Sequence, residues 1–336
     1  MAVRVYLKQA WNLMKQNPLF STLYIVGTGI SIVMTMVIAI VYYVRLAPVY
    51  PETNRMRTLV VKSAKMTNDE STHSANISYA MLKDWFYSLE SAEVSTGVSG
   101  TSYARVTNDK EEIPTYARYT DENFFRVFPL VFLEGKPFTE ADRRSGIHNV
   151  VLTDSYAQQL FGTTKGVVGK NFLMDYTNVK VVGVVKSGSF LTPDSYAQVY
   201  LPYSCRDGYD DEGSHWALGG YRVYILMKES KSVTDVQDEV LELVRKFNVS
   251  DMGDGWKLDL VGQPELYWHS TFRLWSNVAV DWGRVIWMFV GIFMVLLFVP
   301  AFNLSGMISA RMERQLPDLG IRKAFGASRR RLLVQI

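Results

Sequence analysis

The chain has 336 residues, of which 48% are hydrophobic, so it is long and apolar enough to form two domains with packed cores. This composition excludes an intrinsically disordered protein. The formal net charge is only +3, and Cys205 is the single cysteine, which excludes an intrachain disulfide and a cluster of thiolate metal ligands.

Residues 1–17 are predicted to form a cytoplasmic interfacial helix, because apolar and basic side chains fall on different faces. A polar helical extension of the segment that follows explains the pattern equally well. The apolar face consists of Val3, Leu7, Ala10, Trp11 and Met14, and the basic residues are Arg4, Lys8 and Lys15.

Two long stretches contain no Asp, Glu, Lys or Arg: 27 residues over 18–44 and 26 residues over 285–310. At about 1.5 Å per residue, a helix of either length crosses the ~30 Å hydrocarbon core of a bilayer. We therefore predict two transmembrane helices rather than buried helices of a soluble domain. The first stretch is longer than the apolar run of a signal peptide and no cleavage site follows it, so we expect an uncleaved anchor. Gly27 and Ser31 within it form a small-xxx-small pair that permits close approach of another helix.

Basic residues outside these stretches predict the orientation, because basic loops tend to remain cytoplasmic. Residues 1–17 carry three bases and no acid, and residues 311–336 carry seven bases and two acids. The segment 45–284 carries 26 bases and 31 acids. Both termini are therefore predicted to be cytoplasmic, with 45–284 as one large extracytoplasmic domain.

The two ends of this domain, 45–112 and 204–284, each contain a predicted β-α-β unit. In each unit, a segment with helical apolar spacing lies between two segments in which apolar and polar residues alternate, as they do in strands. Two such units separated in sequence predict a split ferredoxin-like subdomain. The predicted elements are 56–62, 77–89 and 92–98 in the first unit, and 221–227, 233–247 and 256–261 in the second.

The intervening residues, 113–203, are predicted to form an inserted, mostly β subdomain. A strand over 150–152 is followed by a short helix with Tyr156, Leu160 and Phe161, by glycine-rich turns, and by an alternating strand over 179–185. The predicted fold class is therefore an α+β membrane protein with two transmembrane helices that flank a large extracytoplasmic domain.

Residues typical of catalysis or metal binding are sparse. His73, His148, His215 and His269 are scattered without a spacing that would place two on one helical face. The chain lacks the phosphate-binding loop, the G-x-S-x-G elbow and the H-E-x-x-H motif, so we predict no enzyme, no cofactor and no metal. An acidic turn is interpreted as a solvated loop in preference to a Ca²⁺ site, since its spacing differs from that of an EF-hand. It consists of Asp207, Asp210, Asp211 and Glu212.

The segment after the second apolar stretch carries the most specific motif. Residues 303–311 (NLSGMISAR) and 319–330 (LGIRKAFGASRR) resemble the cytoplasmic end of the MacB/FtsX-type ABC transporter permeases. The resemblance continues, in order, in the segments expected for the extracytoplasmic domain of that family. These segments are 123–130, 134–138, 150–157, 160–162, 169–170 and 181–185.

The resemblance implies that 311–336 is a coupling segment that docks into a separate ATP-binding subunit. An apolar pair four residues apart, Ile321 and Phe325, suits helix-in-groove recognition, and a lipid-surface helix is the alternative. The basic run 329–331 suits anionic lipid, so we predict no nucleic-acid partner. Pro317 predicts that the coupling helix begins at or after that residue. The coupling residues are Leu319, Gly320, Ile321, Arg322, Lys323, Ala324, Phe325, Gly326 and Ala327.

The implied function is that of a permease subunit in the bacterial inner membrane, which passes ATP-driven motion of its partner to the extracytoplasmic domain. The implied partners are the ATPase, a second permease subunit, the bilayer, and a periplasmic adaptor or outer-membrane component. A two-span sensor and an FtsX-like regulator of wall hydrolases are the alternatives. The family has two further transmembrane helices after the coupling segment, so a fragment is expected.

Overall fold

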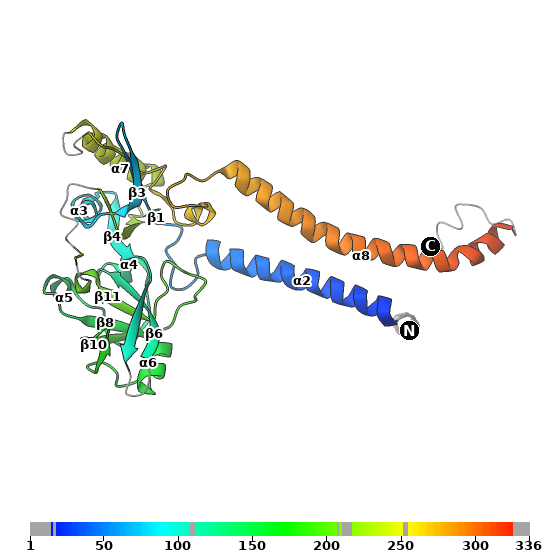
Figure 1. The fold of residues 1–336 in the computed structure, drawn as a ribbon, viewed down its shortest axis with the longest axis horizontal. Coiled ribbons are helices and arrows are strands. Elements are labelled where there is room, and N and C mark those ends of the chain that lie inside the picture. The colour runs from blue at the N-terminus through cyan, green and yellow to red at the C-terminus, as the bar shows by residue number, and fades with distance from the viewer. Residues whose placement is uncertain are drawn as a thin grey trace. The chain divides into compact units, whose positions relative to one another are not determined.

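The computed structural model describes residues 15, 18–107, 112–206, 208–209, 217–250 and 255–324 (Figure 1). The chain divides into two compact units, and each is described by itself. Unit 1 consists of Met1–Tyr42 and Trp282–Ile336, and unit 2 consists of Tyr43–Asp281. The predicted interfacial helix, apart from Lys15, and the four acids of the predicted turn lie outside the described residues.

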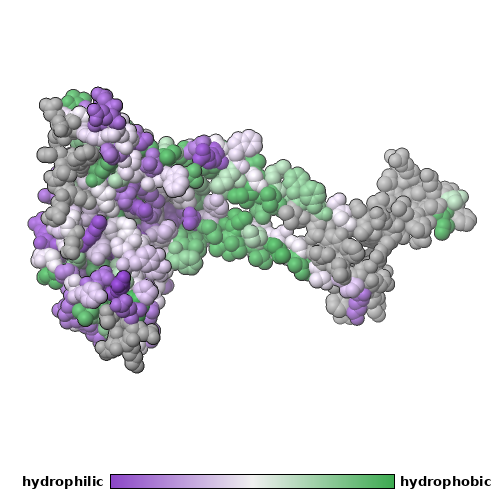
Figure 2. Space-filling model, viewed as in Figure 1, coloured by the Kyte–Doolittle hydropathy of each residue, from purple (hydrophilic) through white to green (hydrophobic). Residues whose placement is uncertain are grey.

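Unit 1 is built on two long helices, α2 (Pro18–Leu46) and α8 (Trp282–Ala324), along which hydrophobic side chains are exposed (Figure 2). Among the described residues, the stretch Ile25–Leu46 is the one helix that is long and apolar enough to cross a membrane. The apolar stretch Trp282–Phe298 at the start of α8 is shorter. The first predicted span therefore coincides with such a helix, and the second span stays a prediction.

Helix α8 runs without a break past Pro317 to Ala324, so the predicted helix start at or after Pro317 is wrong. Proline removes one backbone hydrogen bond, at a cost of about 3 kcal/mol inside a helix. A new helix start would instead leave several backbone N–H and C=O groups unpaired on each side of the break. Continuation through the proline therefore costs less than two separate helices.

The first sheet of unit 2 has eight strands in the order β14–β2–β3–β13–β1–β15, with β12 paired to β3 and β4 paired to β13. The central part, β15–β1–β13–β4, is antiparallel throughout. The strands are β1 (Thr58–Val61), β2 (Ala64–Thr67), β3 (Thr72–Ile77), β4 (Ala92–Ser99), β12 (Leu218–Gly219), β13 (Tyr221–Met227), β14 (Lys257–Asp259) and β15 (Glu265–Leu266).

Two helices cover one face of this sheet. Helix α7 (Val233–Val249) confirms the predicted helix over 233–247 and begins with a capping box between Ser232 and Asp235. The predicted helix over 77–89 is shorter than expected, because α3 (Tyr79–Asp84) gives way to the 3₁₀ turn η1 (Phe86–Ser88).

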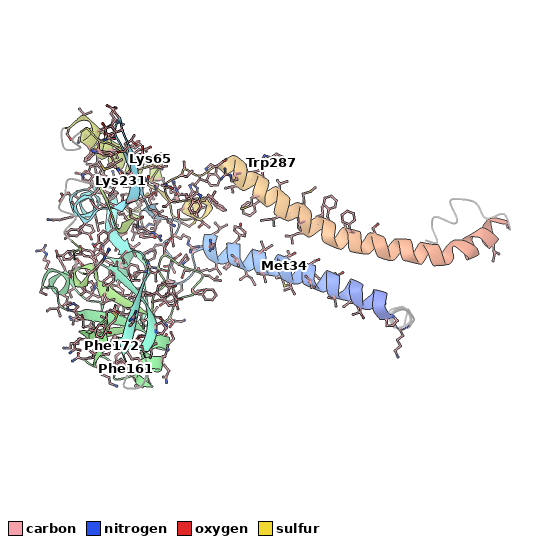
Figure 3. The ribbon with its side chains drawn as sticks, in the orientation of Figure 1. Met34, Lys65, Phe161, Phe172, Lys231 and Trp287 are labelled. Atoms are coloured by element: carbon pink, nitrogen blue, oxygen red, sulfur yellow. The ribbon has the colours of Figure 1, made fainter. Side chains whose placement is uncertain are left out.

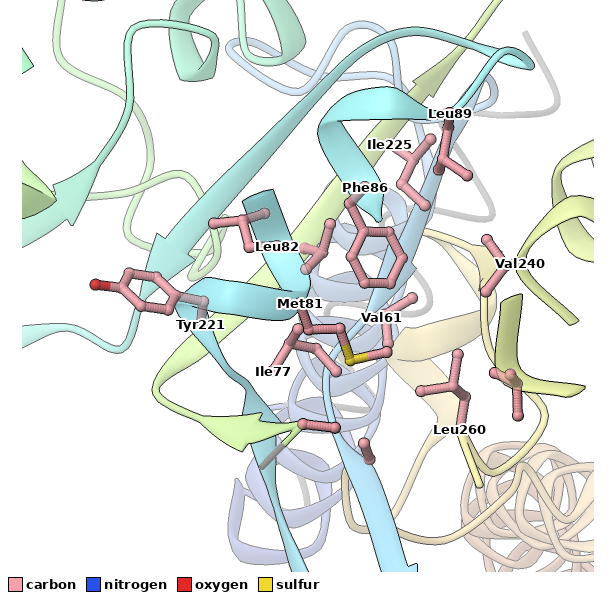
Figure 4. Close-up of a cluster of buried hydrophobic side chains, with 14 of the residues drawn as sticks. Val61, Ile77, Met81, Leu82, Phe86, Leu89, Tyr221, Ile225, Val240 and Leu260 are labelled. Carbon is pink, nitrogen blue, oxygen red and sulfur yellow. The ribbon is translucent and has the colours of Figure 1, made fainter. Parts of the chain in front are cut away.

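Strand β1 faces two different cores, because both faces of the sheet are covered. Leu59 and Val61 point into the core under α3 and α7, whereas Val60 points to the opposite face. Figure 4 shows the first core, to which the helix side contributes Leu82 and Phe86 and the sheet contributes Ile225. Every residue of β1 is buried, which explains its continuous apolar run.

The second sheet has seven strands in the order β7–β10–β8–β11–β6–β5–β9, and an additional pairing between β9 and β10 closes six of them into a barrel. Strand β5 precedes residue 113, so this sheet takes in residues before the predicted boundary. The strands are β5 (Ser102–Thr107), β6 (Glu112–Thr120), β7 (Phe132–Gly135), β8 (Asn149–Thr153), β9 (Asn171–Met174), β10 (Thr177–Val185) and β11 (Val199–Pro202).

The barrel encloses an apolar core, and short helices surround it. Leu152, Val181 and Val199 are fully or almost fully buried inside. The rings of Phe161 and Phe172 lie 6.1 Å apart at its edge (Figure 3). The short helices of unit 2 outside the first sheet are α4 (Phe124–Val127), α5 (Glu140–Arg144), α6 (Asp154–Phe161), η2 (Tyr203–Cys205) and η4 (His269–Phe272).

An aromatic layer joins the barrel to the first sheet. Phe124 and Phe128 of the α4 region lie between Tyr200 of β11 and Tyr224 of β13, with ring centroids 4.9–5.4 Å apart along the chain of contacts. These rings are buried, so the two sheets share one packed interface. Unit 2 is therefore a mixed α+β domain rich in strands.

Candidate functional site

The carboxyl end of α2 is held by the side chain of Arg55. Its Nη1 donates a hydrogen bond of 2.7 Å to the carbonyl oxygen of Val44. The last carbonyls of a helix lack partners within the helix and attract positive charge. Arg55 is only 3% exposed and also forms an ion pair with Glu52, so its buried charge is compensated. The segment that follows α2 thus caps the helix.

The Glu52 carboxylate connects segments that are far apart in the sequence. In addition to the ion pair with Arg55, its Oε1 accepts hydrogen bonds from Ser195 Oγ at 2.7 Å and from Tyr267 Oη at 2.9 Å. Ser195 lies in the loop before β11, and Tyr267 lies in the segment that leads to α8. We call Glu52, Arg55, Ser195 and Tyr267 the Glu52 node. It joins the end of α2 to the barrel and to the approach to α8.

A ring contact and the protonation state of Tyr267 both stabilise the node. The Arg55 guanidinium lies over the ring of Tyr267, 5.2 Å from the centroid, which adds a cation–π contact. Burial raises the pKa of Tyr267 well above its ordinary value, and the charges of Asp194 and Glu52 add to this shift. The phenol therefore stays protonated and remains a donor to Glu52.

A second set of buried charges holds the loop before β11. Asp194 accepts from Lys62 Nζ at 2.9 Å and from Arg222 Nη1 at 3.0 Å. Burial alone would raise the pKa of Asp194, but the two cations hold it well below its ordinary value. Arg118 is buried as well and donates to the carbonyl oxygens of Pro193 at 2.7 Å and Tyr196 at 3.2 Å. The loop is therefore tied to both sheets.

The segment between β15 and α8 is held in a similar way. Arg273 forms a buried ion pair with Glu265 and donates to the carbonyl oxygens of Val278 at 2.6 Å and Val261 at 2.9 Å. Ser63, between β1 and β2, donates to the carbonyl oxygen of Ser276 at 2.5 Å. The chain that approaches α8 is thus attached along its length to the first sheet.

Asp121 lies at the seam between the two sheets and is fully buried. Its carboxylate accepts hydrogen bonds from Thr96 Oγ1 at 2.6 Å, from the Gly97 N–H at 2.9 Å and from Tyr87 Oη at 2.5 Å. It also accepts from the N–H of Phe124 at 3.1 Å, at the start of α4. Burial raises the pKa of Asp121 to about 6, against the opposing effect of these donors. The seam therefore contains a carboxyl group that titrates just below neutral pH.

Among the described residues, the chemistry-bearing side chains named from the sequence form no metal-binding group. Burial raises the pKa of Cys205 to about 12, so its thiol is unreactive at neutral pH. Within the described part of the chain, no group of three His, Cys, Asp or Glu residues is placed to hold a metal ion. His215 lies outside that part. The absence of enzymatic and metal-binding activity stays a prediction.

The predicted coupling residues are only partly described. Leu319 to Ala324 form the last turns of α8, and the Ile321 side chain is 57% exposed. Phe325, Gly326 and Ala327 lie outside the described residues. The proposed apolar pair of Ile321 and Phe325 is therefore untested, although Ile321 is accessible to a partner.

Sequence reasoning missed the Glu52 node, Asp121 and Asp194. Glu52 and Arg55 stand in a short polar segment, PETNR, which looks like an ordinary solvated loop. One signal was available, since an acid and a base stand only three residues apart in the short segment that follows the apolar stretch. The hydrogen-bond partners Ser195 and Tyr267 are more than 140 residues away from Glu52 in the sequence, so no local pattern points to them.

The profile of a known family, described as the MacB-like periplasmic core domain, matches residues 20–243, about two thirds of the chain. The chain belongs to the MacB-like periplasmic core domain family. This confirms the resemblance to MacB/FtsX-type permeases, and the match is to a periplasmic domain rather than to an ATP-binding domain. Together with the N-terminal apolar helix, it indicates a membrane protein with an extracytoplasmic domain.

Individual relatives are distant. The macrolide export ATP-binding/permease protein MacB of Escherichia coli O157:H7 is 20% identical over 224 residues, which cover 66% of this chain and 32% of the relative. MacB of Shigella dysenteriae serotype 1 is 28% identical over 105 residues, which cover 31% of this chain and 16% of the relative. The chain thus spans at most about a third of the length of these MacB proteins.

Solved MacB-type domains are also similar. The periplasmic region of MacB from Actinobacillus actinomycetemcomitans has 17% identity and a TM-score of 0.42, over 59% of this chain and 88% of that region. The extracellular domain of the noncanonic ABC-type transporter YknZ from Gram-positive bacteria has 16% identity and a TM-score of 0.40, over 59% of this chain and 99% of that domain. Both scores are low, so the assignment to the family rests on the sequence match.

Proposed function

We propose that this chain is a permease subunit of an ABC transporter, which converts ATP hydrolysis by a separate subunit into a conformational change of its extracytoplasmic domain. The observation that carries the proposal is the Glu52 node in a MacB-type chain. Through this node, the end of α2, the barrel and the approach to α8 are bound to one buried carboxylate. A displacement of either helix end therefore acts on the whole of unit 2.

The proposed topology has two spans, 18–44 and 285–310, with both termini in the cytoplasm of a bacterial inner membrane. The domain between them, 45–284, combines a split ferredoxin-like subdomain (45–112 and 204–284) with an inserted β-rich subdomain (113–203). The order β15–β1–β13–β4, with α3 and α7 on one face, supports the ferredoxin-like assignment.

On the cytoplasmic side, the segment 311–336 is proposed to dock into the ATP-binding subunit through residues 319–327. The exposed Ile321 at the end of α8 supports a helix-in-groove contact. The further proposed partners are a second permease subunit, as a homodimer or heterodimer, and a periplasmic adaptor or outer-membrane component. The substrate is proposed to be a drug, a peptide or a lipoprotein, which is exported or extracted.

Co-purification tests the proposal. The full chain is purified from its native membrane, and the attached ATP-binding subunit is identified by mass spectrometry and ATPase activity. Ile321→Asp with Phe325→Asp is expected to abolish the association, because charges would enter an apolar groove. Val249→Asp, at an exposed apolar position of unit 2, is the matched control and should retain the ATPase. Unchanged association of the double variant would refute the docking proposal.

A further inference from the structure

Unit 2 carries exposed apolar side chains next to both of its connections to the helices. Phe190 is 74% exposed, Leu274 is 64% exposed and Trp275 is 66% exposed. Each large apolar side chain left in water forgoes about 1.5–3 kcal/mol of burial free energy. Several such side chains in water are therefore unfavourable unless another apolar phase covers them.

Phe190 lies on a turn that is fixed beside the segment after α2. The turn is closed by the Thr192 N–H, which donates to the carbonyl oxygen of Ser189 at 3.0 Å. Tyr50, four residues beyond the end of α2, donates to the carbonyl oxygen of Lys186 at 2.8 Å. Gly188 approaches Pro51 so closely that an added Cβ would lie 3.2 Å from its ring. Phe190 is thus presented where the chain leaves α2.

Leu274 and Trp275 lie on the other connection, just before α8. The Val278 N–H donates to the carbonyl oxygen of Trp275 at 3.2 Å, so this segment turns back on itself only four residues before Trp282. The hydrogen bonds from Arg273 to Val278 and from Ser63 to Ser276 hold the turn against the first sheet. The exposed side chains are therefore fixed in place by the backbone that carries them.

The apolar part of α2 continues to the end of the helix. The apolar stretch Ile25–Leu46 has 22 residues, about 33 Å of helix, which matches the hydrocarbon core. Unit 2 begins at Tyr43, inside this stretch. The first residues of unit 2 therefore enter the headgroup region directly, where aromatic side chains are favoured.

We propose that Phe190, Leu274 and Trp275 form an interfacial anchor that seats the base of unit 2 in the headgroup–acyl boundary of the bilayer. This inference rests on the proposed membrane spans. The anchor holds the domain against the lipid surface at both connections, so that its base is supported while the barrel remains in water. The partner is lipid, and neither an adaptor nor a second copy of the chain is needed to cover these residues.

Depth-dependent quenching of a fluorophore tests the anchor. In the full chain with Cys205→Ser, single cysteines at Phe190, Trp275, Ile32 and Tyr176 are labelled with the fluorophore NBD. The protein is reconstituted in phosphatidylethanolamine–phosphatidylglycerol vesicles with lipids spin-labelled near the headgroup or deep in the acyl chain. Ile32 in α2 reports the span, and Tyr176, 87% exposed on the barrel, is the control.

The anchor predicts that shallow spin labels quench positions 190 and 275 several-fold more strongly than position 176, while deep labels quench position 32. If position 32 is quenched but 190 and 275 behave like 176, the anchor is refuted and the span stands. If position 32 is not quenched, the span and the anchor are both refuted. Blue-shifted emission at 190 and 275 without lipid quenching would mean that protein covers them, which also overturns the proposal.

Discussion

The barrel interior and the Glu52 node are both buried, but they are built from different side chains. The barrel core contains Leu152, Val181 and Val199 and relies on apolar burial. The Glu52 node contains the charges of Glu52 and Arg55, which are removed from water. Buried ion pairs add little net stability, but the loss of one partner leaves a costly unpaired charge. The node is therefore poorly suited to stabilise the fold and well suited to fix the position of a helix end.

The largest expected effect comes from breaking the Glu52 node. Arg55→Met should destabilise unit 2 by about 3–5 kcal/mol, because Glu52 would remain buried without its cation. Thermal unfolding of the full chain in detergent measures this loss. Glu52→Gln combined with Arg55→Met removes both charges and should recover most of it. If the double variant loses as much stability as the single variants Glu52→Gln and Arg55→Met lose when added together, the ion pair is not what holds the node.

A cavity in the barrel should lower the stability of unit 2 by a comparable or smaller amount, but it should leave the Glu52 node intact. Leu152→Ala is expected to destabilise unit 2 by about 2–5 kcal/mol, because a fully buried side chain is lost without relaxation of the surrounding strands. The proposed ATP-binding partner should still respond to the domain as in the unmodified protein, since the Glu52 node is intact. Loss of that response in Leu152→Ala, at a temperature where the variant is folded, would contradict the distinction between the barrel and the node.

Asp121, at the seam between the two sheets, should make the free energy of unfolding depend on pH. The folded-state pKa of Asp121 is raised to about 6 from 3.8, so the native state binds the proton more tightly. Its contribution to stability is present below about pH 4 and is lost as pH rises through about 6, with an upper limit of about 3 kcal/mol. Asp121→Asn should flatten this part of the profile of unfolding free energy against pH. An unchanged profile would assign it to other groups.

The smallest effect is expected at a charge pair on the surface. Arg245 and Glu242 lie 3.1 Å apart on the exposed face of α7. Arg245→Ala should change stability by no more than about 0.5 kcal/mol, because water and salt screen exposed pairs. The same thermal measurement serves as a reference for Arg55→Met. A loss as large as that of Arg55→Met would show that burial is not the deciding factor.

The sequence predicted those parts of the fold that depend on local periodicity. Helix α7 could be predicted because its capping box and apolar spacing lie within one segment. The Glu52 node could not be predicted, because Ser195 and Tyr267, which donate hydrogen bonds to Glu52, come from distant segments. At Pro317 the error is the opposite one, because the proline predicted a helix boundary that the structure does not have. The cost of ending the long helix α8 outweighs the local effect of the proline. The coupling motif was recognised as a pattern, and its side-chain contacts stay a prediction.

The hydrogen bond from Arg55 to Val44 has a consequence for the rotation of α2. Successive carbonyls in a helix are turned by about 100°, since 3.6 residues complete a turn. Arg55 bonds a backbone carbonyl, so the bond requires that carbonyl to point toward Arg55 and does not depend on the side chain of Val44. A carbonyl one residue earlier or later points about 100° away, whereas a carbonyl one whole turn away points in nearly the same direction. The contact thus fixes the angular phase of the helix end that belongs to unit 2.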